Sequence, residues 1–549
     1  MNRQMAAGIL LWFAANLFSC SPMKENADVL VINANVYTVN ENFAPAEAFA
    51  VREGYFVEVG TTKDIMDKYR SDHIIDAGGN AVYPGFMDGH CHFYGYGENL
   101  YRWADLSVCK SFDDVLDTLE AHLAKHPAEW LLGRGWDHNN WSPAVFPDNT
   151  RIEERFPGKK VLLIRIDGHA SVASKAAMKA AGMDATTRVS GGEVVLKGGK
   201  PTGLLIDNAD LAVKALIPKM TLKEQRNAIL EAQQACFSVG LTSVVDAGLP
   251  VDIIELYRNM QEEGSLKMKI NAMINPDENT LQTYLPHGPY TDERLRINTV
   301  KMFADGALGS RGALMLEPYS DAHDTKGLML HESDFYYNIC EQAYQAGFQV
   351  SIHAIGDAAN RFVLDMYADF LKGPNDRRWR VEHAQIVHPD DFEKFGAYQI
   401  IPSIQSTHAT SDMLWAVHRL GDERLPGAYA QQKLLAQNGW LINGTDFPIE
   451  GINPLHTFYT AVARKDLMGR PEEGFLMDEA LSRKEALKSM TLWVAKGSFE
   501  EDSKGSIETG KHADFVILDR DILKVPETEI LKAQVLSTFV HGERVYQHP

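Results

Sequence analysis

Two histidines one residue apart, His90 and His92, follow an apolar run at 81–83 that is typical of a buried strand. On an extended backbone, residues i and i+2 point to the same face, so the two imidazoles would converge on one point. Converging imidazole nitrogens suit a divalent metal ion. Two histidines at this spacing also arise by chance, so the interpretation depends on what accompanies them.

Three more residues of metal-binding type occupy similar positions. His353 and His383 each end an apolar run, and Asp446 follows another. In barrel enzymes the chemistry lies at the carboxyl ends of the strands, because the connecting loops converge there. We therefore expect all five side chains to face one barrel mouth.

A lysine, Lys301, lies in a further apolar run at 299–303. A positively charged ammonium group would be repelled by divalent cations. Carboxylation of the amine by carbon dioxide would remove this difficulty, because the resulting carbamate is an anion that can bridge two metals. The alternative is an inward-facing lysine that pairs with a carboxylate.

Eight apolar runs predict buried strands, and helical patterns separate most of them from the second onward. The runs span 81–87, 241–246, 269–274, 299–303, 349–353, 380–383, 400–404 and 440–444. Eight strands with helical crossovers predict an α/β fold, the (β/α)8 TIM barrel, and a doubly wound open sheet is the alternative. A chain of 549 residues can hold one such barrel together with accessory parts.

The accessory parts are expected at both ends of the chain and after the first barrel strand. Residues 28–80 and 502–549 contain short β-rich runs, too few at either end to bury a core alone, so we predict one composite β-sandwich. The barrel then spans 81–501. Within it, residues 93–221 are too many for a loop, and we predict an inserted cap over the barrel mouth.

The N-terminus predicts export. Residues 1–19 combine a basic start with a short apolar stretch typical of a signal peptide, and Ser19 precedes Cys20 as in a bacterial lipobox. We expect lipid on Cys20, a tether at 20–27, and a lipoprotein anchored to a membrane and facing the periplasm or cell exterior. An ordinary cleaved signal or an N-terminal membrane anchor is the alternative. The net charge of −20 disfavours a nucleic-acid partner, and the sequence leaves open whether the chain forms a homodimer.

Taken together, the chain resembles the amidohydrolase superfamily, and within it the amidohydrolase family 3 branch, similar to N-substituted formamide deformylase. The motifs that carry the resemblance are GFMDGHCH at 85–92, VKMFADGALGSR at 300–311, HAIGD at 353–357, VEHAQ at 381–385, GTDFP at 444–448 and GSIETGKHADF at 505–515. They extend over nearly all of the mature chain.

The resemblance implies one or two divalent metals at the barrel mouth, with zinc as the expected metal. One metal would be held by His90, His92 and Asp446 and the other by His353 and His383, with N6-carboxylysine at Lys301 as the bridge. Iron, nickel and manganese are the other candidates, since imidazole and carboxylate also bind these metals. Asp446 would be the catalytic residue, moving a proton from metal-activated hydroxide to the departing nitrogen.

The implied reaction is hydrolysis of a C–N bond in a small non-peptide amide, such as an N-substituted formamide or a related N-acyl compound. Residues expected to bind the substrate are Trp136, Asp137, His169, Arg311 and His408. A cyclic amidohydrolase or an aminohydrolase would use the same metals. A catalytically silent, ligand-binding lipoprotein is the alternative from another class.

Overall fold

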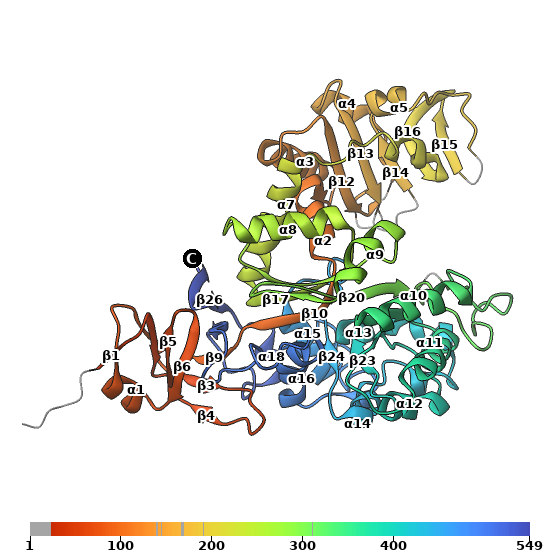
Figure 1. Cartoon of the computed structure of the whole chain (residues 1–549). Coiled ribbons are helices and arrows are strands. Elements are labelled where there is room, and N and C mark those ends of the chain that lie inside the picture. Colours follow the sequence, from red (N-terminus) through yellow and green to blue (C-terminus); the bar gives the residue numbers. More distant parts are fainter. Residues whose placement is uncertain (1–23, 139–140, 144, 166–169, 190–191, 310) are drawn as a thin grey trace, which may run out of the picture.

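The computed structural model describes residues 24–138, 141–143, 145–165, 170–189, 192–309 and 311–549. They form a barrel, a β-sandwich at one side of it, and a separate lobe that stands on two helices (Figure 1). The predicted signal peptide, Cys20 and His169 lie outside the described residues. Within the described ranges, no helix is both long and apolar enough to cross a bilayer.

Eight parallel strands form the barrel, which confirms the predicted (β/α)8 fold. Each is hydrogen-bonded to the next in the order β10-β17-β18-β20-β21-β22-β23-β24. Their bounds are β10 (Phe86–Cys91), β17 (Leu241–Leu249), β18 (Lys269–Ile274), β20 (Leu295–Phe303), β21 (Gln349–Ala354), β22 (Arg380–His383), β23 (Ile401–Ile404) and β24 (Ile442–Asn443). Helices that follow the strands include α8 (Val251–Glu262), α10 (Ser333–Ala346), α11 (Asp357–Leu371), α13 (Ser406–Leu420) and α14 (Gln431–Asn438).

The barrel closes where β10 meets the segment that follows β24. Asp88 on β10 accepts hydrogen bonds from the backbone nitrogen of Thr445, at 3.1 Å, and from its hydroxyl, at 2.7 Å. The backbone nitrogen of Asp446 donates to the carbonyl of His90 at 2.8 Å. This approach needs glycine at Gly444, because a Cβ there would lie 2.4 Å from the backbone nitrogen of His90. We call this contact the barrel seam.

The first predicted strand, 81–87, is two strands. β9 (Ala81–Pro84) belongs to the sandwich, and only β10 belongs to the barrel. The chain passes between them at Gly85, whose backbone nitrogen donates to Asp514 in the sandwich, whereas that of Phe86 donates to Gly240 in the barrel. Both strands are buried, so they read as one apolar run in the sequence.

Both ends of the chain build the sandwich. One sheet has the order β6-β5-β2-β8, and the other has the order β27-β26-β25-β9-β3-β4. The N-terminal strands are β2 (Val29–Ile32), β3 (Asn35–Tyr37), β4 (Pro45–Ala46), β5 (Ala48–Arg52), β6 (Tyr55–Gly60) and β8 (Ile74–Asp76), and the C-terminal strands are β25 (Phe515–Leu518), β26 (Val535–Val540) and β27 (Glu543–Gln547). Phe515 packs between Phe49 and Phe539, with ring centroids 4.9 and 4.2 Å away, so the core joins the two chain ends.

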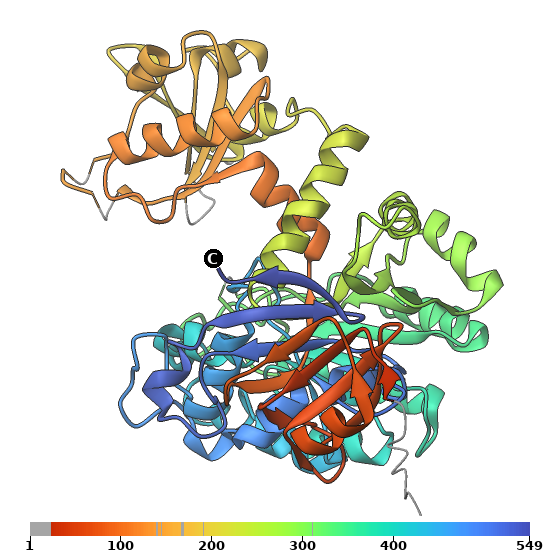
Figure 2. The same cartoon turned by 90° about the vertical axis from the view of Figure 1, so that its left-hand side faces the viewer.

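The long insert after β10 forms the separate lobe. Its sheet has the order β11-β12-β13-β14-β16-β15 and has its own hydrophobic core. The strands are β11 (Trp103–Asp105), β12 (Trp130–Trp136), β13 (Lys160–Arg165), β14 (Ala170–Ala173), β15 (Gly192–Lys197) and β16 (Lys200–Asp207), with helices α3 (Phe112–Lys125), α4 (Thr150–Arg155) and α5 (Lys175–Ala180). Helices α2 (Phe93–Arg102) and α7 (Leu222–Ser238) lie side by side and join the lobe to the barrel (Figure 2).

Replacing Gly444 by alanine tests the barrel seam. The new Cβ would meet backbone atoms of β10, which cannot yield as a flexible side chain can. We expect a loss of about 1–3 kcal/mol in the free energy of unfolding, seen as a lower melting temperature. Gly60→Ala is the control, because a Cβ there would meet nothing within 4 Å. Equal melting temperatures for the two variants would contradict a tightly packed seam.

Candidate metal centre

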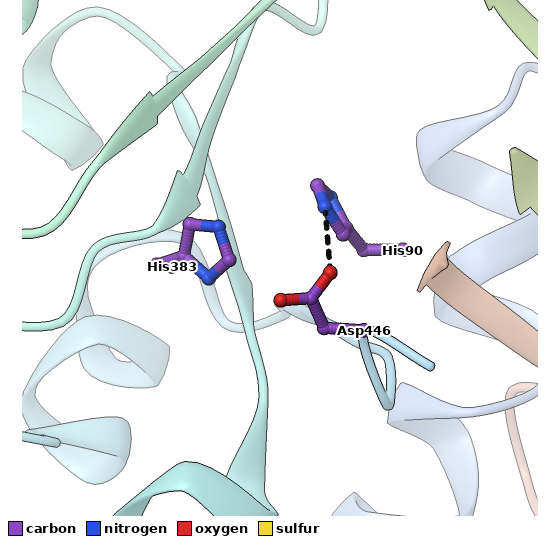
Figure 3. A group of neighbouring side chains, drawn as sticks. All are labelled: His90, His383 and Asp446. Atoms are coloured by element: carbon purple, nitrogen blue, oxygen red, sulfur yellow. Dashed lines mark ion pairs between the residues drawn. The ribbon is translucent and has the colours of Figure 1, made fainter. Parts of the chain in front are cut away.

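Three predicted ligands from distant parts of the chain converge at the barrel mouth. His90 lies near the end of β10, His383 ends β22, and Asp446 follows β24. One ligand atom from each lies within 4.8 Å of the others, and Figure 3 shows the imidazoles of His90 and His383 on either side of the carboxylate. His90 Nε2 is 3.5 Å from Asp446 Oδ1. The spacing suits a single cation between them.

His92 and His353 extend this group. His92 Nε2 lies 3.3 Å from Asp446 Oδ1, the same oxygen that faces His90. The ring of His353, near the end of β21, is 4.5 Å from the ring of His383, measured between centroids. The five predicted ligands therefore form one continuous cluster, with Asp446 beside the first histidine pair and His383 beside His353.

Lys301 on β20 is completely buried beside this cluster. Its Nζ donates to the backbone carbonyl of Met302 at 3.2 Å and lies 3.6 Å from the ring centroid of Phe303. Among the described residues, no carboxylate comes within ion-pair distance of Nζ. Burial lowers the pKa of Lys301 to about 8, although the charges of Glu382 and Asp446 oppose this shift.

The donor atoms fit a divalent metal. His383 Nδ1 and Asp446 Oδ1 are buried, and neither has a hydrogen-bond partner within the part of the chain that the structure describes. Unsatisfied buried polar atoms are costly and rare in folded proteins. Imidazole nitrogens and a carboxylate oxygen are the ligands that zinc and similar cations bind, so a metal would satisfy both atoms.

Two of the ligands have a left-handed backbone. φ is 71° at His383 and 60° at Asp446, a conformation that residues other than glycine seldom adopt. Such strain persists only where the surrounding structure enforces it, and it concentrates at functional sites. At Asp446 the barrel seam supplies this constraint, because the neighbouring Thr445 is bound to Asp88.

Glu382 orients His90, and the sequence analysis missed it. Its Oε2 lies 2.5 Å from His90 Nδ1, while its Oε1 pairs with Arg380 Nε at 2.7 Å and accepts the Ser351 hydroxyl at 2.6 Å. Burial would raise the pKa of Glu382, but Arg380 and His90 outweigh it and hold the pKa well below its usual range. An ionised carboxylate can only accept, so His90 Nδ1 donates and Nε2 faces Asp446. The signal available in the sequence was the charged pair Arg380 and Glu382, which occupies alternate positions of a buried strand.

His408, which the sequence predicts to bind the substrate, lies beside the metal centre. Its Nε2 lies 3.6 Å from Asp446 Oδ2, and its Nδ1 lies 3.0 Å from Glu450 Oε1. Burial opposes protonation of the imidazole, but the two carboxylates outweigh burial and raise the pKa of His408 to about 10. The neighbouring imidazoles of His408 and His92 likewise outweigh burial and hold the pKa of Asp446 well below its usual range.

Three predicted substrate-binding residues lie elsewhere. The indole of Trp136 is buried in the core of the lobe, where its nitrogen donates to the Leu163 carbonyl at 3.0 Å. Asp137 pairs with Arg165 at 2.6 Å. Arg311 pairs with Asp321 at 2.9 Å, and none of the three lines the cavity beside the metal centre. The motif that contains Trp136 and Asp137 is local in the sequence and does not encode how far the lobe stands from the barrel mouth.

A cavity of about 360 Å³ opens beside the metal centre. Besides the ligand cluster, its walls are formed by Phe303, Ala307, Leu308, Gly309, Ile355, Gln385, His408, Asp412, Trp415, Ile449 and Glu450. No described residue of the lobe is among them. Asp412 and Trp415 were not predicted, although their spacing from His408 along α13, four and seven residues, places all three on one helix face.

The fold and this cluster define a metal-dependent hydrolase built on an α/β barrel. A model of the amidohydrolase family matches residues 73–546, and the chain therefore belongs to that family. The predicted resemblance is confirmed. The protein is a hydrolase that acts on carbon–nitrogen bonds other than peptide bonds.

Several relatives are similar over nearly their whole length. The Arabidopsis thaliana protein LONG AFTER FAR-RED 3 is 32% identical, with 95% of this chain and 92% of that protein covered. The putative amidohydrolase YtcJ of Bacillus subtilis is 31% identical, with 93% and 98% covered. N-substituted formamide deformylase of Arthrobacter pascens is 27% identical, with 96% and 99% covered. The crystal structure of an uncharacterized metal-dependent hydrolase from Pyrococcus horikoshii superposes with a TM-score of 0.75 at 27% identity, covering 91% of this chain and 99% of that one.

Replacing Glu382 by glutamine tests its orienting role. The variant loses the charge that holds His90 Nδ1–H and leaves Arg380 buried without a counter-charge. We expect metal affinity to fall about 10–100-fold, measured by titration against a competing chelator, together with a lower melting temperature. Ser351→Ala is the control, because it removes one hydrogen bond to the same carboxylate and keeps its charge. Metal affinity equal to that of the unmodified protein in Glu382→Gln would refute the role.

Proposed function

We propose that the enzyme hydrolyses the amide bond of a small N-acylated amine, either an N-substituted formamide or a related N-acyl compound. The observation that carries the proposal is the convergence of His90, His383 and Asp446 within 4.8 Å at the barrel mouth. The similarity to a formamide deformylase over 96% of this chain supports the substrate class. The products would be a carboxylic acid and an amine.

We further propose which residues hold the metals. One divalent ion, expected to be zinc, would be bound by His90, His92 and Asp446, a second by His353 and His383, and both by carboxylated Lys301. Bound there, such metals would lower the pKa of water toward about 7 and polarise a carbonyl group. Carboxylation would turn the Lys301 amine, which donates to the Met302 carbonyl, into an anion beside the cluster.

Asp446 is the proton carrier in the proposed reaction. Its carboxylate accepts a proton from the attacking water as the water oxygen bonds to the carbonyl carbon. The same carboxyl group then gives this proton to the nitrogen as the C–N bond breaks. The hydroxyl of water ends on the acid and its proton on the amine, so the atoms balance.

His408 and Glu450 hold this carrier in place. His408 contacts Asp446 Oδ2 and is fixed on its other side by Glu450. A protonated imidazole at this position keeps Asp446 ionised before the reaction begins and leaves Oδ1 directed at the ligand cluster. We therefore assign His408 a positioning role, in addition to any contact with the substrate.

The apolar part of the cavity suits the organic substituents of such an amide. Phe303, Leu308, Ile355, Trp415 and Ile449 line it. Apolar and aromatic walls with a few polar groups are typical of sites for small organic molecules. This composition supports an N-acyl compound with a hydrocarbon or aromatic group.

A substrate screen with two variants tests the proposal. Metal-loaded protein is assayed against N-substituted formamides and other N-acyl amines, with separate detection of amine and ammonia. Asp446→Asn should lower kcat by about 10²–10⁴-fold, the usual worth of a general acid–base group, and keep the melting temperature. Lys301→Ala should lose bound metal and regain some activity with added short carboxylates.

The exposed carboxylate Asp422 provides the control, since Asp422→Asn removes a charge outside the metal centre. Release of ammonia in place of amine would favour an aminohydrolase. Absence of divalent metal after expression with added zinc, iron, nickel or manganese would instead favour a silent binding protein.

We also propose that the chain is an exported bacterial lipoprotein, anchored through Cys20 on a membrane surface facing the periplasm or cell exterior. The basic start, the apolar stretch and the Ser19–Cys20 pair support this. Cys20→Ser should abolish labelling by radioactive palmitate and release the protein from the membrane fraction. Ser21→Ala is the control and should remain labelled. Continued labelling of Cys20→Ser would rule out this anchor.

A further inference from the structure

One carboxylate in the cavity wall has no role in the reaction derived above. Asp412 lies on α13 and is partly buried at the cavity edge. Its Oδ2 accepts hydrogen bonds from the hydroxyl of Tyr429 at 2.8 Å and from Gln385 Nε2 at 3.2 Å. Among the described residues, no hydrogen bond or ion pair reaches Oδ1. One oxygen is thus anchored by two neutral donors, and the other is available to a ligand.

The corner around Asp412 carries more negative than positive charge. His408 is the cation there, and it contacts two other carboxylates, Asp446 and Glu450. No lysine or arginine lines the cavity in the described part of the chain. The arginine closest in sequence, Arg419, already pairs with Asp321. The carboxylate of Asp412 therefore lacks a counter-charge of its own.

The pKa of Asp412 agrees with this excess of negative charge. Burial raises the pKa of the Asp412 carboxyl to about 6, and the nearby Glu450 adds to the effect, while His408 and Tyr429 partly oppose it. A partly buried carboxylate without a counter-charge is stabilised by any cation that enters the cavity. Charge-assisted hydrogen bonds of this kind are among the stronger polar contacts in proteins.

The position of Asp412 relates it to the scissile bond. It follows His408 by one helical turn on α13, so the two side chains are about 5–6 Å apart at their Cβ atoms. Since His408 contacts Asp446, a substrate whose amide lies at Asp446 can reach Asp412 with a short chain on its nitrogen. Trp415, three residues further along, provides an aromatic surface beside this path.

We propose that Asp412 binds a positively charged amino group on the substrate's N-substituent, so that the enzyme acts on N-acylated diamines and related amides that keep a second, basic nitrogen. The ammonium would donate a hydrogen bond to Asp412 Oδ1. This inference rests on the proposed amide hydrolysis and specifies its substrates. It also disfavours N-acyl amino acids, because the cavity wall offers their carboxylate no arginine or lysine.

Two matched formamides test the inference. N-formylputrescine ends in an ammonium group, and N-formylpentylamine ends in a methyl group at the same distance. Metal-loaded enzyme should have a higher kcat/KM for the first compound. Asp412→Asn should lower kcat/KM for N-formylputrescine by about 10–100-fold, the usual worth of a hydrogen bond to a charged group, and change that for N-formylpentylamine by less than about twofold.

The substitution is chosen to preserve the fold. The asparagine carbonyl can accept the hydrogen bonds from Tyr429 and Gln385, and its amide replaces the free oxygen with a donor. Asp422→Asn is the control for loss of one negative charge outside the cavity, and it should retain both kcat/KM values. Melting temperatures of all variants are measured alongside.

The outcomes separate this inference from the proposed function. Equal losses on both formamides in Asp412→Asn, or no preference for N-formylputrescine in the unmodified enzyme, would overturn the role of Asp412 while amide hydrolysis stands. If neither formamide is cleaved, the proposed deformylation of simple N-substituted formamides is wrong. Calorimetric titration with the same compounds then tests whether Asp412 binds the ammonium group. Tighter binding of N-formylputrescine that is lost in Asp412→Asn would support the inference, and equal binding would overturn it.

Discussion

The barrel mouth depends on the close approach of β10 and the segment after β24. The Asp88 carboxylate links the two through the backbone and hydroxyl of Thr445, and Gly444 permits the contact because it has no side chain. β10 also carries His90 and His92, and the facing segment carries Asp446. The interaction that closes the barrel therefore sets the distance between the metal ligands, so folding and metal binding share one constraint.

Buried charges outside the ligand cluster complete the site. Glu382, held by Arg380, fixes the ring of His90, and His408, held by Glu450, fixes Asp446. His90 and Asp446 thus each have a charged partner, Glu382 for His90 and His408 for Asp446. Burying such charged pairs in a barrel interior costs desolvation energy. Here the pairs orient the ligands, because they leave one nitrogen or oxygen of each ligand directed at the other ligands.

Much of the barrel could be predicted, because its strands are apolar runs in the sequence and the metal ligands lie at the ends of those runs. The split at Gly85 could not, because two buried strands from different sheets read as one run. Trp136 and Asp137 were expected at the substrate, but a local motif carries no information on the distance between lobe and barrel. Glu382 was missed because its importance comes from the partner it finds 292 residues away. Asp412 has helical spacing from His408, which becomes meaningful only once α13 is known to border the cavity.

The two-helix stalk beneath the lobe has an evolutionary consequence. The lobe buries its own apolar core, and the chain leaves and re-enters the barrel through adjacent helices, α2 and α7 (Figure 2). An insertion whose entry and exit lie together can be lengthened, recombined or exchanged without disturbing the host. Descendants of this architecture can thus acquire new surface modules while inheriting an unchanged set of ligands.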